Sequence, residues 1–159
     1  MVYSFGVRAL GIDYGTRRIG LALSDATGLL ARPWKTISVN GGPGRVAAVL
    51  AEEAAALLRE PDGLSAIALG YPRRLNGQPT TQTAVVEEIA VALRSSIGVP
   101  VVLQDERLSS VEAERELAVR EKDWRKRKAL LDARSAAIIL QDYLDERRRR
   151  AERVESENA

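Results

Sequence analysis

The sequence predicts an α/β fold in which helices flank a mixed, five-stranded sheet. The predicted strands are short apolar runs bounded by turn-forming residues, at 7–13, 19–24, 34–39, 64–70 and 99–104. Apolar side chains recur at helical spacing over 46–58 and 86–97, between the later runs. Three strands in succession, followed by two strand–helix–strand crossovers, make a mixed sheet with helices on its faces.

Helical patterns continue beyond the last predicted strand. Ser109 and Glu112 have the spacing of a capping box, and 129–144 forms a long amphipathic pattern. Residues 146–159 contain almost no apolar side chains, so we expect a charged C-terminal tail that is frayed or disordered. With 159 residues in all, the chain predicts one domain over 1–145.

The composition excludes several classes of active site. The chain has no histidine and no cysteine, which excludes Ser-His-Asp and Cys-His triads, imidazole bases, disulfides and Cys- or His-based metal sites. The net charge is only +2, so attraction to an acidic partner must come from local patches. No apolar run has the length of a membrane span, and the first residues lack the pattern of a signal peptide, so we expect a cytoplasmic protein.

Carboxylates gather at one edge of the predicted sheet. The first, fourth and fifth strands are expected to run parallel, and ligands in such sheets bind outside the carboxyl ends. Asp13 ends the first strand, and Asp105 and Glu106 end the last. Neighbouring strand residues point to opposite faces, and periodicity does not choose between Asp105 and Glu106. Asp132 is the third candidate, because it lies on an otherwise apolar helix stripe.

Converging carboxylates repel one another, and a divalent cation offsets that repulsion. In a two-metal site one ion activates water and the other stabilises the leaving oxygen, so phosphodiester cleavage needs no histidine or cysteine. Each acid also has a purely structural interpretation. Asp13 is a candidate turn former, Glu106 a surface ion-pair partner of Arg107, and Asp132 a helix N-cap.

Basic side chains near this edge are candidates for contacts with nucleic-acid phosphates. Trp124, which lies among cations, could stack on a base. The charged segment around it could also be a solvated helix face. The candidate nucleic-acid-binding residues are Arg17, Arg18, Arg73, Arg74, Arg107, Lys122, Trp124, Arg125, Lys126, Arg127 and Lys128.

Three segments carry a resemblance to a known family. They are A-L-G-I-D-Y-G-T-R-R-I-G-L-A-L-S-D at 9–25, D-E-R-L-S-S-V-E-A at 105–113 and D-A-R-S-A-A-I-I-L-Q-D-Y-L-D at 132–145. Together they resemble the YqgF/RuvX-type family of RNase H-like nucleases, described as Holliday junction resolvases and pre-16S ribosomal RNA nucleases. The resemblance extends over nearly the whole chain, from about residue 7 to 145.

The resemblance implies a fold, a cofactor and a set of site residues. It implies an RNase H-like fold, Mg²⁺ or Mn²⁺ as cofactor, and precursor rRNA or branched DNA as substrate. The family's metal-binding acids fall on Asp13, Glu106 and Asp132, which selects Glu106 over Asp105. This chain departs from the family after the fourth strand, where it reads G-Y-P-R-R-L-N-G at 70–77.

Two other classes of function share parts of this pattern. The segment 11–16 also resembles the first phosphate loop of actin-like ATPases, although the chain has no second loop of that kind. A non-catalytic nucleic-acid-binding protein, such as a transcription elongation factor, would use the same basic residues. A junction resolvase would be expected to act as a homodimer, because a two-fold substrate is matched by two-fold symmetry.

Overall fold

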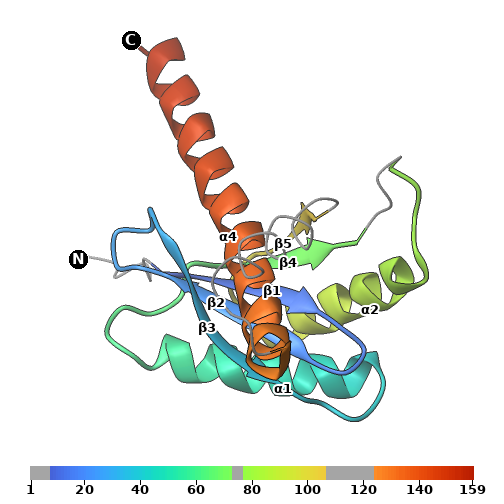
Figure 1. Ribbon diagram of the computed structural model, residues 1–159. Coiled ribbons are helices and arrows are strands. Elements are labelled where there is room, and N and C mark those ends of the chain that lie inside the picture. Colours follow the sequence, from blue (N-terminus) through green and yellow to red (C-terminus); the bar gives the residue numbers. More distant parts are fainter. Residues whose placement is uncertain (1–7, 73–76, 107–123) are drawn as a thin grey trace.

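The computed structural model describes residues 8–72, 77–106 and 124–159 (Figure 1). The described elements, in chain order, are β1 (Ala9–Tyr14), β2 (Ile19–Ser24), β3 (Ala31–Ile37), α1 (Pro43–Leu58), β4 (Ala66–Tyr71), α2 (Thr81–Ser96), β5 (Val101–Asp105) and α4 (Trp124–Glu157). The helix predicted from the capping-box spacing at Ser109 lies outside the described residues.

One five-stranded sheet organises the molecule, with the strand order β3-β2-β1-β4-β5. The pairs β1–β2 and β2–β3 are antiparallel, whereas β1–β4 and β4–β5 are parallel. The carboxyl ends of β1, β4 and β5 therefore lie at one edge. This arrangement confirms the predicted mixed sheet and the placement of Asp13 and Glu106 at a common edge.

Local signals explain where α1 and α2 begin. Pro43 opens α1, at a position where its missing N–H costs no helical hydrogen bond. At the start of α2, the Thr80 backbone N–H donates to Thr83 Oγ1 at 2.8 Å, as part of a capping box. Both helices were predicted from apolar spacing, and both present buried side chains to the sheet.

The two faces of the sheet have different side chains. One face carries large apolar residues, such as Leu10 and Leu69, which pack against α1 and α2 in the main core. The other carries small ones, such as Ala22 and Ala68, and α4 lies across it (Figure 1). Since strand residues alternate between faces, the large and small side chains also alternate along each central strand.

Three glycines on this small-residue face allow α4 to approach closely. A Cβ added to Gly20 would lie 1.9 Å from the carbonyl oxygen of Asp132, and one added to Gly11 would lie 2.7 Å from that of Ala136. A Cβ on Gly70 would lie 2.7 Å from Ile139 Cδ1. At Gly20 and Gly11 the backbone of α4 thus occupies the space that a side chain would fill, and at Gly70 the side chain of Ile139 does so.

The third strand and the long helix differ from their predicted bounds. β3 covers Ala31–Ile37 rather than 34–39, because Ala31 and Pro33 already pair with β2. The sequence pattern did not indicate this earlier start, because proline usually argues against a strand. Proline is nevertheless tolerated on an edge strand such as β3. α4 begins at Trp124, so Asp132 lies inside the helix and the N-cap interpretation of this residue is wrong.

The C-terminal segment is helical, which corrects the prediction of a frayed or disordered tail over 146–159. α4 continues to Glu157 and projects beyond the sheet (Figure 1). Its charged side chains support the helix: Arg150 pairs with Glu146 at 3.0 Å and Arg148 with Asp145 at 3.1 Å. Arginine, glutamate and alanine also have high helix propensity, which the lack of apolar residues conceals. Among the described residues, none of the helices has both the length and the apolar character of a membrane span.

The contact at Gly20 makes a testable prediction. Gly20→Ala forces the added methyl group into the backbone of α4, so we expect the free energy of unfolding to fall by about 1–3 kcal/mol or more. Gly44→Ala is the matched control, because nothing lies within 4 Å of a Cβ at this helical position. It should leave the stability unchanged or raise it by up to about 1 kcal/mol. Urea denaturation measures both, and equal stability of the two variants would contradict the packing described above.

Candidate active site

Asp13 and Glu106 lie at the ends of β1 and β5, on the face covered by α4. Asp13 follows Gly11 by two positions and therefore shares its face. Glu106 comes directly after β5, but its backbone N–H still donates to the carbonyl oxygen of Tyr71 at 3.4 Å. The pleat therefore continues one residue past the strand and turns Glu106 toward α4. Gly70 leaves the room for this side chain, because a Cβ there would lie 2.6 Å from Glu106 Oε2.

The two carboxyl groups are hydrogen-bonded to each other. Burial, together with the neighbouring charge of Asp13, raises the pKa of Glu106 to about 9. The pKa of Asp13 rises to about 6, mainly because of burial; the hydrogen bond with Glu106 partly offsets this, and the charge of Asp132 adds to it. Because the hydrogen bond lowers the pKa of Asp13 and raises that of Glu106, we infer that the pair shares one proton, with Glu106 as the donor and Asp13 as the acceptor.

One oxygen of this pair has no partner. Glu106 Oε2 is buried and accepts no hydrogen bond from any described residue. A buried polar atom without a partner costs free energy, and such atoms in folded proteins call for a bound group. An oxygen of this kind beside a second carboxylate suits a hard divalent cation.

Asp132 approaches the pair from α4 but is engaged by Arg18. The Arg18 Nε atom lies 3.0 Å from Asp132 Oδ2, and both side chains are only about a quarter exposed, at 29% and 27%. Asp132 is nevertheless near enough to raise the pKa of Asp13 by repulsion between like charges. Three acids from distant parts of the chain therefore share one electrostatic environment.

Asp13, Glu106 and Asp132 do not form a complete metal-binding site in the structure as it stands. Within the described residues, no three acidic side chains are grouped so that they could hold one metal ion as they stand. Asp13 and Glu106 provide adjacent oxygen donors, while one oxygen of Asp132 contacts Arg18. The carboxylate oxygens are donors that suit Mg²⁺ or Mn²⁺. Glu106 Oε2 is the donor atom that a bound cation would satisfy, because it is buried and has no hydrogen-bond partner among the described residues.

The predicted basic residues fall into three groups. Arg17 is exposed in the turn between β1 and β2, whereas Arg18 is paired with Asp132. Arg73, Arg74, Arg107 and Lys122 lie outside the described residues. The backbone of Trp124, Arg125, Lys126, Arg127 and Lys128 forms the start of α4, and their side chains also lie outside the described part of the chain.

Sequence reasoning missed the residues that make space for the site. Gly20 admits the backbone of Asp132, and Gly70 admits the carboxylate of Glu106. The available signal is the recurrence of Gly or Ala at every second strand position, over 9–11 and 20–22, which marks a face in close contact with another backbone. The pairing of Arg18 with Asp132 has no such signal, because it depends on the placement of α4.

Comparison with known proteins gives the family of this chain. The profile of the RuvX family, described as Holliday junction resolvase, matches residues 7–146. The chain belongs to the RuvX family. This membership confirms the resemblance seen in the three sequence segments, and the matched region contains all three acids of the candidate site.

Curated relatives of this RuvX-family chain cover almost all of it. A protein of Geobacillus kaustophilus is 37% identical over 147 residues, 89% of this chain and all of the relative. One of Bacillus subtilis is 36% identical over 139 residues, 87% of this chain and 98% of the relative. Both carry the name "Putative pre-16S rRNA nuclease".

A solved structure of T. thermophilus RuvC in complex with a Holliday junction substrate matches the fold. The TM-score is 0.53 at 18% sequence identity, over 88% of this chain and 94% of RuvC. This likeness confirms the RNase H-like fold that the resemblance implied.

The proton shared by Asp13 and Glu106 should make the free energy of unfolding depend on pH. A raised pKa means that the folded chain keeps protons that the unfolded chain releases. In metal-free buffer the stability should therefore fall as the pH rises, from 3.8 to about 6 for Asp13 and from 4.5 to about 9 for Glu106. Glu106→Gln keeps a hydrogen-bond donor without the titration, so we expect a flatter pH profile and a higher melting temperature at about pH 8.

Thermal melts in EDTA between about pH 5 and pH 9 measure this difference. Glu88→Gln is the control, because Glu88 is an exposed carboxylate on α2, away from the site. Its profile should run parallel to that of the unmodified protein. If Glu106→Gln also runs parallel, the two acids do not share a proton.

Proposed function

We propose that this protein is a divalent-metal-dependent nuclease that hydrolyses phosphodiester bonds in structured nucleic acid, with Asp13, Glu106 and Asp132 as its metal-binding and catalytic residues. The observation that carries the proposal is the buried pair of Asp13 and Glu106, with one unpartnered oxygen, in a chain of the RuvX family. Buried acids with strongly shifted pKa values are typical of catalytic sites.

Each acid has a distinct part in this proposal. Glu106 would hold the shared proton in the metal-free site and would lose it to solvent on binding a cation through Oε2, so that both members of the pair could serve as anionic ligands. Asp132 supplies the third oxygen donor from α4, and Arg18 orients its carboxylate. In a two-metal arrangement, bound Mg²⁺ or Mn²⁺ would activate water and stabilise the charge on the leaving oxygen. The low polarity around the pair strengthens these electrostatic effects.

Two substrates follow from the names of related proteins. The curated relatives are named for pre-16S rRNA and cover nearly the same length, so we propose precursor 16S rRNA, cut at its 5′ end, as one substrate. The family description and the likeness to RuvC favour a Holliday junction as the second. Junction cleavage would require a homodimer, because two strands must be cut symmetrically. Either substrate would place the protein in the cytoplasm.

The first test is cleavage by an Asp13→Asn variant. The amide cannot replace the anionic ligand, so we expect cleavage to be abolished, while the melting temperature stays equal or rises because one repelling charge is removed. The assay incubates the protein with Mn²⁺ and, in parallel, a precursor 16S rRNA fragment and a four-way DNA junction, and maps the cuts. Asp62→Asn, in an exposed turn after α1, is the matched control and should retain full cleavage.

Cleavage by Asp13→Asn at the rate of the unmodified protein would refute the assignment of the site. Binding of both substrates without any product, for the unmodified protein with Mg²⁺ or Mn²⁺, would favour a non-catalytic nucleic-acid-binding protein instead. The positions of the cuts distinguish rRNA processing from junction resolution.

Metal binding can be measured without activity. Mn²⁺ should raise the melting temperature of the unmodified protein, because a ligand that binds only the folded state stabilises it by mass action. Glu106→Gln lacks the charged oxygen and should show little or no rise. The rise should grow with pH as the shared proton becomes easier to displace. An equal shift in both proteins would place the metal elsewhere.

A further inference from the structure

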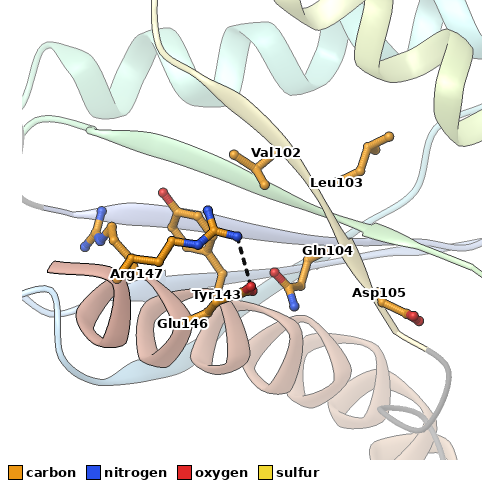
Figure 2. A pocket seen from close by; sticks show the side chains of 8 residues that line it. Val102, Leu103, Gln104, Asp105, Tyr143, Glu146 and Arg147 are labelled. Carbon is orange, nitrogen blue, oxygen red and sulfur yellow. Dashed lines mark hydrogen bonds and ion pairs between the residues drawn. The ribbon is translucent and has the colours of Figure 1, made fainter. Parts of the chain in front are cut away.

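A pocket separates β5 from α4, next to the candidate active site. It has a volume of about 370 Å³, within the range of small-ligand sites. Its walls include Gln104 and Asp105 from β5, and Tyr143, Glu146 and Arg147 from α4 (Figure 2). In the described part of the chain β5 is the edge strand of the sheet, so no described strand closes the pocket on its outer side.

The charges in this pocket are arranged unevenly. Glu146 is neutralised by Arg150, at 3.0 Å. Arg147 is partly buried and lies over the Tyr143 ring, 5.4 Å from its centroid, and its Nη1 donates to Ser65 Oγ at 3.4 Å. Within the described part of the chain Arg147 has no carboxylate partner, so its positive charge remains available to an anion.

The pocket lies beside the candidate active site along β5, although none of Asp13, Glu106 and Asp132 lines it. Asp105 lines one end, and the next residue along the chain is Glu106. Gln104 precedes Glu106 by two positions, so both residues point to the face covered by α4. Figure 2 shows Asp105 and Arg147 toward opposite ends of the pocket, with Gln104 between them. The end of the pocket at Gln104 and Asp105 is thus the one nearer the proposed metal site, and the basic end lies away from it.

We propose that this pocket holds a nucleotide a few positions along the strand from the bond that is cut, with its phosphate on Arg147 and its base beside Tyr143 and Gln104. The inference rests on the proposed function, since the strand must enter from the metal site. A guanidinium group binds a phosphate through paired N–H donors. The flat surfaces of tyrosine and arginine accept an unstacked base, and a glutamine amide can hydrogen-bond to its edge.

A nucleic-acid strand fits the pocket better than a protein segment. A peptide added to the edge of β5 would use backbone hydrogen bonds and would need no free cation at one end. The pocket instead has at one end an arginine that lacks a carboxylate partner among the described residues, and at the other end it lies next to the proposed metal site, which matches a chain that carries a negative charge at every repeat. Both RNA and DNA have this chemistry, so the test uses one probe of each.

The test compares two arginines of the same helix. Arg147→Met removes the charge in the pocket but keeps an unbranched side chain, and Arg149→Met removes an equal charge from a part of α4 that does not line this pocket. Binding of fluorescein-labelled single-stranded RNA and DNA is measured by anisotropy in EDTA, over a series of salt concentrations. EDTA prevents cleavage, so the measurement reports binding alone.

We expect Arg147→Met to weaken binding severalfold, and Arg149→Met to leave it nearly unchanged. Loss of one phosphate contact should also lower the slope of log Kd against log salt by about 0.7 for these single-stranded probes. Arg147→Lys keeps the charge and should preserve the slope while losing part of the affinity, since lysine cannot make the paired contact. Melting temperatures of all three variants show that the fold is retained.

The remaining outcomes overturn the proposal in distinguishable ways. Equal effects of the substitutions at 147 and 149 would exclude the pocket while leaving the nuclease function intact. Failure of the unmodified protein to bind either probe and to cut any substrate would remove the proposed function and the pocket with it. If sedimentation shows a dimer that Arg147→Met dissociates, with oligonucleotide binding unchanged, the pocket is an interface between two copies.

Discussion

The carbonyl oxygen of Asp132 lies where a side chain on Gly20 would have to be, and this backbone contact sets the position of the whole site. Gly11 makes a similar approach to Ala136. Interiors are close-packed and transmit strain, so a methyl group at either contact would push α4 away from the sheet. Asp13 would then lose its electrostatic contact with Asp132. The glycines therefore position the candidate site, although they have no side chains with which to bind a substrate.

The electrostatics of the site depend on that packing. Close approach removes water from Asp13 and Glu106, and desolvation is the largest cause of the rise in both pKa values. A shared proton then stabilises the pair, and Arg18 compensates Asp132. Repelling carboxylates that destabilise the fold are typical of sites built for a cation, because function and maximal stability make opposite demands on them. The site shows how stability is given up locally while the large apolar residues around α1 and α2 maintain the fold.

The sequence predicts the sheet well because each central strand is a short apolar run with clear boundaries. The shared edge of Asp13 and Glu106 follows from the parallel order of β1, β4 and β5 alone. Periodicity could not choose between Asp105 and Glu106, because the answer depends on a single hydrogen bond from Glu106 to Tyr71 beyond the strand's end. The start of α4 was misplaced because its first turns are strongly charged. The helical C-terminal segment was missed because its support comes from ion pairs, such as Arg150 with Glu146, rather than from apolar contacts.

The length of α4 has a consequence for the geometry of the molecule. Asp132 and Arg147 belong to one continuous helix of 34 residues. At 1.5 Å per residue, the fifteen steps between them correspond to ~22 Å along the axis. Because α4 is a continuous helix, it fixes the distance between Asp132, next to the sheet edge, and Arg147, far from that edge. Adding or deleting one residue between them would rotate the two ends by about 100° relative to each other, so this stretch of the chain has little freedom to change in length.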